Sequence, residues 1–177
     1  IRTEIARDGD SYVINGRKWW TTGAPDRRAK IAIVMGRTDP SAPAHKQQSM
    51  VLVPMDTPGV TVVRPLSVFG YDDAPHGHAE MLFENVRVPV EDRLGAVGDG
   101  FRIALEILNS GRLGLAAGSS LGTRRILDYA LAYAKERKQF GRPIGSFEMI
   151  QRKFALAAAD CYAADAAWMT CASMVDR

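Results

Sequence analysis

The residues best placed to do chemistry lie in the stretch Tyr12–Gly23, which reads YVINGRKWWTTG. Side chains alternate across a β-strand, so Trp20 and Thr22 are expected to share one face. That face would offer a large flat ring beside a hydroxyl that can donate or accept a hydrogen bond. This pairing suits a planar heteroaromatic ligand. A core strand with a buried Trp20 and a solvated Thr22 is the alternative that the sequence leaves open.

The same stretch carries the strongest turn signal of the chain. Asn15-Gly16 separates two apolar runs, and a two-residue type I′ turn needs positive φ at both central positions. The sequence therefore predicts a hairpin there, preceded by another turn at Asp8-Gly9-Asp10.

Three further places hold reactive or charged side chains, each with a plainer alternative. Arg112 lies beside a row of small residues on a predicted helix, where it serves either a ligand or the solvated surface. His76 and His78 fall in a loop that either faces a substrate or stays on the surface. The basic cluster Lys135–Arg142 is typical of a solvated helix C-terminus.

The composition narrows the class of protein. The 177 residues are 46% hydrophobic and 24% charged, as in a globular protein. A net charge of +3 fits anionic small-molecule ligands but is too small to indicate nucleic-acid binding. No run is long and apolar enough to predict a transmembrane helix. Because the chain begins at Ile1 and the helical pattern at Met174–Arg177 has no stop signal, the sequence is expected to be a piece of a longer protein.

The two cysteines, Cys161 and Cys171, fall on one predicted helix. Ten helical residues separate them by about 15 Å, which is beyond disulfide reach. They are therefore predicted to act as small apolar residues in a reducing compartment. No metal site is expected, because the histidines lie far from both cysteines in sequence.

Short β-branched and apolar runs predict a β domain at residues 1–95. The expected strands are Ile1–Ala6, Ser11–Ile14, Lys30–Met35, Met50–Pro54, Val60–Val63 and Ala79–Val88. Their spacing favours an antiparallel barrel or sandwich over a parallel nucleotide-binding sheet, which needs helices between its strands. The glycines of Pro89–Gly100 do not match a phosphate-binding loop and are expected to form a linker.

Residues 96–177 predict a long antiparallel helical hairpin, so the fold class is α+β. The first helix, Phe101–Arg137, ends before Gly141-Arg142-Pro143, and the second starts at Phe147. One face of the first helix is expected to carry an apolar stripe of Phe101, Leu105, Leu108, Leu115, Ile126, Tyr129 and Tyr133. The second helix has a regular stripe of Phe147, Ile150, Phe154, Ala157, Cys161, Ala164, Trp168, Cys171 and Val175. The remaining apolar surface is expected to require further helices or another subunit.

Four separated motifs carry a specific resemblance. They are YVINGRKWWTTG, FENVRVP, GFRIALEILNSGRLGLAAG and ERKQFGRPIGSFEMIQ, and they follow in this order across nearly the whole chain. Together they closely resemble the acyl-CoA dehydrogenase family, in a long-chain or very-long-chain branch. The resemblance implies most of the family's middle β domain and the first half of its C-terminal four-helix domain.

The resemblance also implies which residues bind FAD. Trp20 matches the tryptophan that packs against the flavin ring, and Thr22 matches the threonine whose hydroxyl reaches flavin N5. Arg137 matches the arginine that contacts the FAD pyrophosphate of the neighbouring subunit, a role suited to a permanently charged guanidinium. Gln139 and Phe140 fall where the family contacts the same FAD.

For the acyl-CoA, the resemblance implies Asn109 and Arg112, which match positions near that ligand. Gly111 stands where some members place their catalytic glutamate, and a glycine cannot act as a base. The general base is therefore expected beyond Arg177, so no residue of this chain is a candidate for that role.

The implied reaction is α,β-desaturation of an acyl-CoA thioester, a step of fatty-acid β-oxidation. A glutamate removes the α-proton while the β-hydrogen leaves as a hydride to flavin N5. The implied partners are an electron-transferring flavoprotein and further copies of the chain in a dimer or tetramer. The expected location is the cytoplasm of a bacterium or the mitochondrial matrix of a eukaryote. An acyl-CoA oxidase, in which oxygen reaches the reduced flavin, and a catalytically inactive fragment of such an enzyme are the alternatives.

Overall fold

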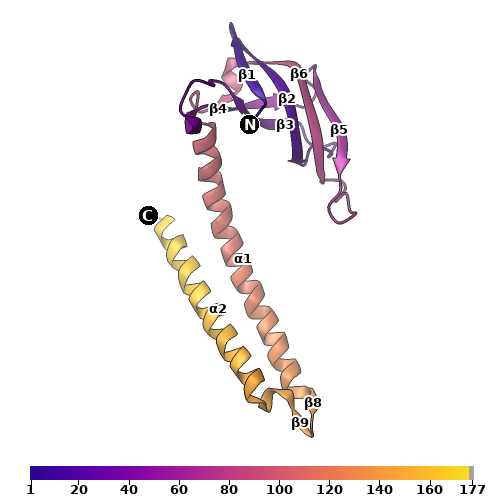
Figure 1. The fold of residues 1–177 in the computed structure, drawn as a ribbon, viewed down its shortest axis with the longest axis vertical. Helices are drawn as coiled ribbons and strands as arrows, with labels where there is room; N and C mark the ends of the chain where they lie inside the picture. The colour runs from indigo at the N-terminus through magenta and orange to yellow at the C-terminus, as the bar shows by residue number, and fades with distance from the viewer. Residues whose placement is uncertain (176–177) are drawn as a thin grey trace. The chain divides into compact units, whose positions relative to one another are not determined.

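The computed structural model describes residues 1–175, which form two compact units. The first is Ile1–Leu105, and the second begins at Glu106 and takes up the rest of the described residues. The α+β class expected from the sequence is confirmed, because strands occupy the first part of the chain and two long helices follow (Figure 1). The expected helical continuation over Asp176 and Arg177 lies outside the described residues.

One seven-stranded sheet dominates the first unit. Its strands are β1 (Glu4–Asp8), β2 (Ser11–Thr22), β3 (Ile31–Arg37), β4 (Gln48–Pro54), β5 (Val60–Leu66), β6 (His78–Pro89) and β7 (Arg93–Leu94). The spatial order is β5-β6-β2-β1-β3-β4-β7. The neighbours pair antiparallel except β1 and β3, which are parallel where Glu4 pairs with Arg37. The sequence had predicted a purely antiparallel arrangement. The sheet is instead mixed, because the β1–β3 pair is parallel.

The core of this unit comes from the inward-facing side chains of the strands. Ile5, Ile14, Val51, Met81 and Phe83 are each no more than 1% exposed. Full burial of side chains of this size contributes about 1.5–3 kcal/mol each. This packing holds the central pair β2 and β6 in register, and those two strands carry the candidate site.

The predicted turn at Asp8-Gly9-Asp10 is confirmed, because Asp8 pairs with Ser11 and closes the β1–β2 hairpin. The hairpin predicted at Asn15-Gly16 is wrong. Strand β2 runs straight through these residues, and its register against β6 shifts between Ile14 and Gly16, as in a β-bulge.

Close packing explains why a glycine stands in that bulge. A Cβ on Gly16 would lie 2.7 Å from the Cα of Thr3, and the Gly16 φ is 148°. The neighbouring Asn15 uses its side-chain oxygen to accept a hydrogen bond from the backbone N–H of Asn85, at 2.8 Å. The pair Asn15-Gly16, which has the composition of a local turn, thus marks the close approach of β2 to Thr3 and to Asn85 on β6.

The segment expected to be a linker, Pro89–Gly100, is instead part of the sheet unit. Its β7 pairs with β4, and the backbone N–H of Gly98 donates to the Ser49 hydroxyl at 2.9 Å. A 3₁₀ turn at Val90–Asp92 precedes β7.

The second unit is an antiparallel helical hairpin (Figure 1). Helix α1 (Gly100–Glu136) and helix α2 (Glu148–Val175) are joined by two short strands, β8 (Lys138–Gln139) and β9 (Arg142–Pro143). A 3₁₀ turn at Ile144–Ser146 leads from β9 towards α2. None of the helices within residues 1–175 combines the length and apolarity needed to cross a membrane.

The predicted core stripe of α2 is partly confirmed, because Cys161 is buried and Phe154 and Trp168 are half-buried. On α1, Leu115 and Ile126 of the predicted apolar stripe are 72% and 69% exposed. Ser120 and Ala134 are buried further along the same helix. Small residues allow close helix approach, whereas the larger apolar stripe of α1 remains uncovered by the described residues.

Candidate functional site

The end of β2 departs from regular strand geometry where the candidate ring stands. Trp20 has a φ of 61°, and the β2–β6 register shifts between Lys18 and Thr21. Positive φ is uncommon for a bulky residue and costs about 1–3 kcal/mol, so the surrounding sheet has to impose it. Trp20 is 42% exposed, which rules out the alternative that its ring is a buried core residue.

His78 joins the two side chains that were predicted to share a face. It is the backbone partner of Thr22, and its Nδ1 lies 3.1 Å from the Thr22 hydroxyl oxygen. Its ring also packs edge-to-face with Trp20, with centroids 5.8 Å apart and planes at 68°. Trp20 and Thr22 therefore both contact one imidazole, although the bulge interrupts strict alternation along β2.

The loop before β6 is fixed by a second histidine, which contacts a carboxylate rather than the candidate ring. His76 Nδ1 lies 3.0 Å from an oxygen of Asp26. Arg28 donates to both oxygens of Asp26 through Nε and Nη2. The side-chain hydrogen bond from Arg28, helped by its backbone N–H, lowers the pKa of Asp26 to about 2. The carboxylate thus stays ionised and holds the loop next to the site.

A charged cluster crosses the strands that frame the site. Glu80 on β6 binds Arg17 on β2 at 2.7 Å and Arg64 on β5 at 2.8 Å. The hydrogen bond from Arg64 is the main cause that lowers the pKa of Glu80. These bonds tie together the three strands on which the site is built.

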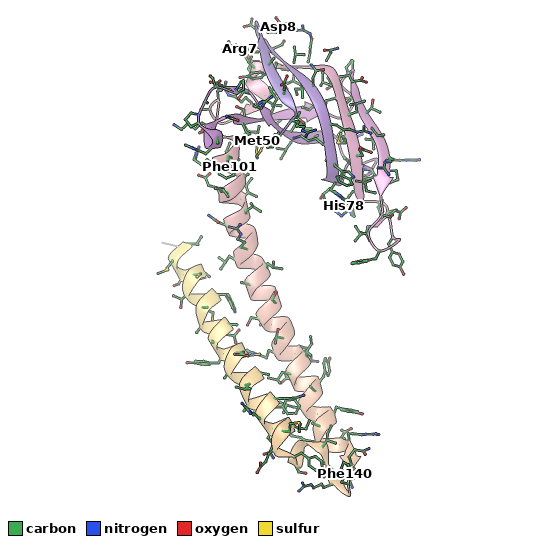
Figure 2. All side chains as sticks on the ribbon, in the orientation of Figure 1. Arg7, Asp8, Met50, His78, Phe101 and Phe140 are labelled. Atoms are coloured by element: carbon green, nitrogen blue, oxygen red, sulfur yellow. The ribbon has the colours of Figure 1, made fainter. Side chains whose placement is uncertain are left out.

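Arg137, Gln139 and Phe140, which the family resemblance matches to contacts with the FAD of a neighbouring subunit, lie at or next to the β8–β9 turn. Gln139 pairs with Arg142, so Phe140 and Gly141 are the two turn residues. Their φ values of 51° and 77° are positive at both positions, as a type I′ turn requires. Phe140 is 93% exposed at the tip of this turn (Figure 2).

Arg137 precedes the turn and is exposed. Its backbone is fixed on both sides, because its N–H donates to Tyr133 and its carbonyl accepts from Ile144. Among residues 1–175 its guanidinium forms no ion pair or hydrogen bond. A permanent cation and an exposed ring are thus presented together at one end of the hairpin.

The residues matched to the acyl-CoA lie on α1. Arg112 Nη1 donates to the Asn109 side-chain oxygen at 3.3 Å. Both residues line a cleft of about 720 Å³ between α1 and α2, together with Leu113 and Trp168. The helix glycine Gly111 has nothing within 4 Å of where its Cβ would lie. The structure thus brings Asn109 and Arg112 together in one cleft.

Two contacts were missed by the sequence analysis. His78 was treated only as a loop histidine, and no local pattern reveals its pairing with a residue 56 positions away. Asp165 is buried between the helices, where it accepts from Ser120 at 2.6 Å and from Trp168 at 3.2 Å. The sequence did carry a signal for the second contact, because Asp165 is an acidic residue between Cys161 and Trp168, two members of the predicted apolar stripe. Arg124 completes the network as an ion pair with Asp165.

The predicted site residues divide between the two units. Trp20 and Thr22 belong to the first, and Asn109, Arg112, Arg137, Gln139 and Phe140 belong to the second. Within residues 1–175 no group of three or more His, Cys, Asp or Glu side chains is placed to hold a metal ion.

Comparisons with known proteins place the chain in a family. Family sequence models match residues 1–86, as the acyl-CoA dehydrogenase middle domain, and residues 98–177, as the acyl-CoA dehydrogenase C-terminal domain. A protein of Mycobacterium tuberculosis, named probable acyl-CoA dehydrogenase FadE2, is 52% identical over 155 residues. That alignment covers 88% of this chain and 38% of the relative, so the chain spans well under half the relative's length.

Solved structures agree with the sequence relatives. A glutaryl-coenzyme A dehydrogenase in complex with glutaryl-CoA has a TM-score of 0.82 at 33% identity, over 99% of this chain and 43% of that one. A glutaryl-CoA dehydrogenase from Mycobacterium smegmatis in complex with FADH2 has a TM-score of 0.74 at 29% identity, over 93% of this chain and 40% of that one. This chain belongs to the acyl-CoA dehydrogenase family and spans its middle domain and part of its C-terminal domain.

Proposed function

We propose that the protein carrying this sequence is an FAD-dependent acyl-CoA dehydrogenase that desaturates acyl-CoA thioesters between the α and β carbons. The observation that carries the proposal is that the half-exposed Trp20 ring and the Thr22 hydroxyl both contact His78, on a sheet of this family. Family members solved with glutaryl-CoA and with FADH2 support both the substrate class and the cofactor.

The residues present fit the chemistry of FAD. An isoalloxazine ring needs a flat apolar neighbour and hydrogen-bonding groups at its edge, and Trp20 and Thr22 supply one of each. A pyrophosphate needs a cation, and Arg137 has no competing acidic partner among residues 1–175. Gln139 and the exposed Phe140 extend the same surface at the β8–β9 turn.

Each of these residues has a separate task in the proposed reaction. When bound, FAD supplies the acceptor for the hydride that leaves the β carbon. Thr22 orients the reacting edge of the ring by a hydrogen bond, and Trp20 excludes water from one side of it. Asn109 and Arg112 line the helix cleft, where we place part of the acyl-CoA. Gly111 has no acid–base group, so the general base has to come from a glutamate elsewhere, which we propose lies beyond Arg177.

The proposal extends to partners and location. We propose that electrons pass from the reduced protein to an electron-transferring flavoprotein, as part of β-oxidation. We further propose that the protein works as a homodimer or homotetramer, in which Arg137 reaches the FAD of a neighbouring subunit. The location would be the bacterial cytoplasm or the mitochondrial matrix.

The role of Thr22 is tested in the complete protein that carries this sequence. Thr22→Ala is expected to retain FAD but to be reduced by acyl-CoA roughly two- to tenfold more slowly, because one neutral hydrogen bond is lost. The measurement is the anaerobic rate of flavin bleaching after rapid mixing with substrate. Thr22→Ser keeps the hydroxyl and should stay close to wild type, and Thr61→Ala on β5 controls for loss of an exposed strand threonine. An unchanged rate in Thr22→Ala would contradict this role.

The electron acceptor distinguishes a dehydrogenase from an oxidase. A dehydrogenase should reduce an electron-transferring flavoprotein and release little hydrogen peroxide in air. Stoichiometric peroxide would favour the oxidase instead. A purified complete protein without flavin absorbance would contradict the proposed function altogether.

A further inference from the structure

His78 is held in one place by the strands on both sides of it. As the first residue of β6, it pairs with Thr22 on β2 and with Leu66 on β5. The backbone just before it is also fixed, because Gly23 N–H donates to the Gly77 carbonyl at 2.9 Å and Gly77 N–H donates to Asp73 at 3.0 Å. Its imidazole is therefore a pre-positioned group.

The contact between His78 and Thr22 controls the single hydroxyl hydrogen of the threonine. With Nδ1 unprotonated, the imidazole accepts that hydrogen, so Thr22 can only accept a hydrogen bond from a ligand. With Nδ1 protonated, the imidazole donates to the Thr22 oxygen, and the hydroxyl hydrogen is free to be donated to a ligand. The histidine thus decides which kind of ligand atom Thr22 can bind.

This choice matters for a flavin. The N5 atom of a flavin accepts a hydrogen bond in the oxidised form and carries a hydrogen to donate in the reduced form. A threonine whose hydroxyl can point either way serves both forms. A threonine locked in one direction serves only one of them.

The same imidazole also fixes the neighbouring ring. Trp20 stands in an unfavourable left-handed conformation, and the edge-to-face contact with His78 is one of its two aromatic contacts, the other being Trp19 at 5.8 Å. Contacts of this kind contribute beyond simple burial. His78 therefore holds the two residues that would touch the flavin.

We propose that His78 is a positioning residue of the flavin site, which orients the Thr22 hydroxyl through Nδ1 and holds the Trp20 ring by packing against it. The inference rests on the proposed function, because it needs a flavin at Trp20 and Thr22. It goes beyond that function by assigning a role to a residue outside the flavin contacts.

Two substitutions separate the tasks of the imidazole in the complete flavoprotein. His78→Phe keeps a ring against Trp20 but removes the nitrogen that contacts Thr22. His78→Asn loses the ring but places a polar side-chain atom near the position of Nδ1. His76→Asn is the matched control, because His76 is a histidine two residues earlier that contacts Asp26 instead.

The readouts are the absorbance spectrum and reduction potential of the bound flavin, and the anaerobic rate of its reduction at saturating acyl-CoA. His78→Phe is expected to slow reduction roughly two- to tenfold, with little change in KM, because a neutral hydrogen bond is lost from a group that does not touch the substrate. His78→Asn should recover much of that rate but show a shifted flavin spectrum. His76→Asn leaves the contacts of His78 with Thr22 and Trp20 in place, so it should change each readout less than His78→Phe does.

A double-mutant comparison decides whether His78 acts through Thr22. The combination His78→Phe with Thr22→Ala should be no slower than Thr22→Ala alone, because the two residues share one interaction. Multiplied effects, or a His78→Phe protein that binds FAD and behaves as wild type, would overturn the inference while leaving the proposed function intact. A complete wild-type protein that binds no FAD would overturn both.

Discussion

Three aromatic residues, Trp20, Phe69 and Phe140, adopt backbone conformations that their side chains disfavour. Trp20 and Phe140 have φ values of 61° and 51°, and Phe140 exposes 93% of its surface. An exposed aromatic residue gains little from burial to offset a strained backbone, which costs about 1–3 kcal/mol. The family resemblance implies that Trp20 and Phe140 both contact FAD, and binding a ligand would give the strain at each of them a physical reason. Phe69 has the same backbone strain and is matched to no ligand contact.

Asp26 is expected to make the free energy of unfolding of the sheet unit depend on pH in the acidic range. Its pKa is lowered to about 2, so its contribution to folding is complete above about pH 4, where the unfolded chain is also ionised. As the pH falls from about 4 to about 2, the contribution is lost. The free energy of unfolding of the wild type should therefore approach that of Asp26→Asn over this range. Urea unfolding followed at several pH values between 2 and 6 measures it.

The control for this prediction is Asp56→Asn. Asp56 is exposed and has no ion pair or hydrogen bond among residues 1–175. Its substitution should leave the pH dependence of unfolding unchanged. If Asp26→Asn kept the full acid dependence of the wild type between pH 4 and 2, the ion cluster of Asp26, Arg28 and His76 would not be its source.

Individual elements show which structural features can be predicted from sequence patterns and which cannot. The strands of the sheet other than β7, the β1–β2 turn and both long helices were predicted, because propensity and periodicity act over a few residues. The Asn15-Gly16 signal failed because the glycine is needed for the approach of Thr3, a tertiary contact. The turn at Phe140-Gly141 carries no strong local signal, since a phenylalanine occupies a position that favours Asn or Gly.

The contact between α1 and α2 shows the same limit. Spacing finds an apolar face but does not say which neighbour covers it. The face that meets α2 is marked by Ser120, whose hydroxyl donates to the buried Asp165. A polar residue at the centre of a helix contact is invisible to a search for apolar periodicity.

The helical hairpin is predicted to depend on Asp165. Asp165→Ala removes the acceptor of Ser120 and Trp168 and the charge partner of Arg124. The loss should lower the free energy of unfolding by about 1–3 kcal/mol, the cost of leaving buried polar groups unsatisfied. Chemical denaturation followed by circular dichroism at a helix band measures it. Asp160→Ala, at an exposed position on α2, is the matched control and should change stability little.

A smaller loss in Asp165→Ala than in Asp160→Ala would contradict a central role for this network. Asp165→Asn adds a further distinction. It keeps an acceptor oxygen for Ser120 but removes the charge that pairs with Arg124. An intermediate stability is therefore expected.

At the scale of the whole molecule, the sheet unit has a core of its own, whereas the hairpin leaves much of its apolar surface uncovered. Among residues 1–175, Leu115, Ile126, Tyr129 and Tyr133 are 60–72% exposed. Exposed apolar surface of this extent is typical of interfaces. The sequence analysis had already placed Trp20 and Thr22 in a β domain at residues 1–95, and the other predicted site residues in a helical part at residues 96–177.

The 177-residue chain is accordingly predicted to self-associate. Sedimentation velocity over a concentration series should show species larger than the monomer. Replacing Leu115 and Ile126 by glutamate should shift the population towards monomer, because charge is costly at an apolar contact. Thr123→Glu, a charge added at an exposed polar position of α1, should have a smaller effect. A chain that stays monomeric at all concentrations would contradict the prediction.

The placement of the three tryptophans has an optical consequence. Trp19 and Trp20 lie as neighbours in the first unit, whereas Trp168 stands in the second with its indole N–H bound to Asp165. Each compact unit therefore carries its own intrinsic fluorophore, one as a coupled pair and the other next to a carboxylate. Replacing Trp168 by phenylalanine would leave an emission signal that belongs to the sheet unit alone. The unfolding of the two units, and the quenching of Trp20 by a bound flavin, can then be followed separately without an attached dye.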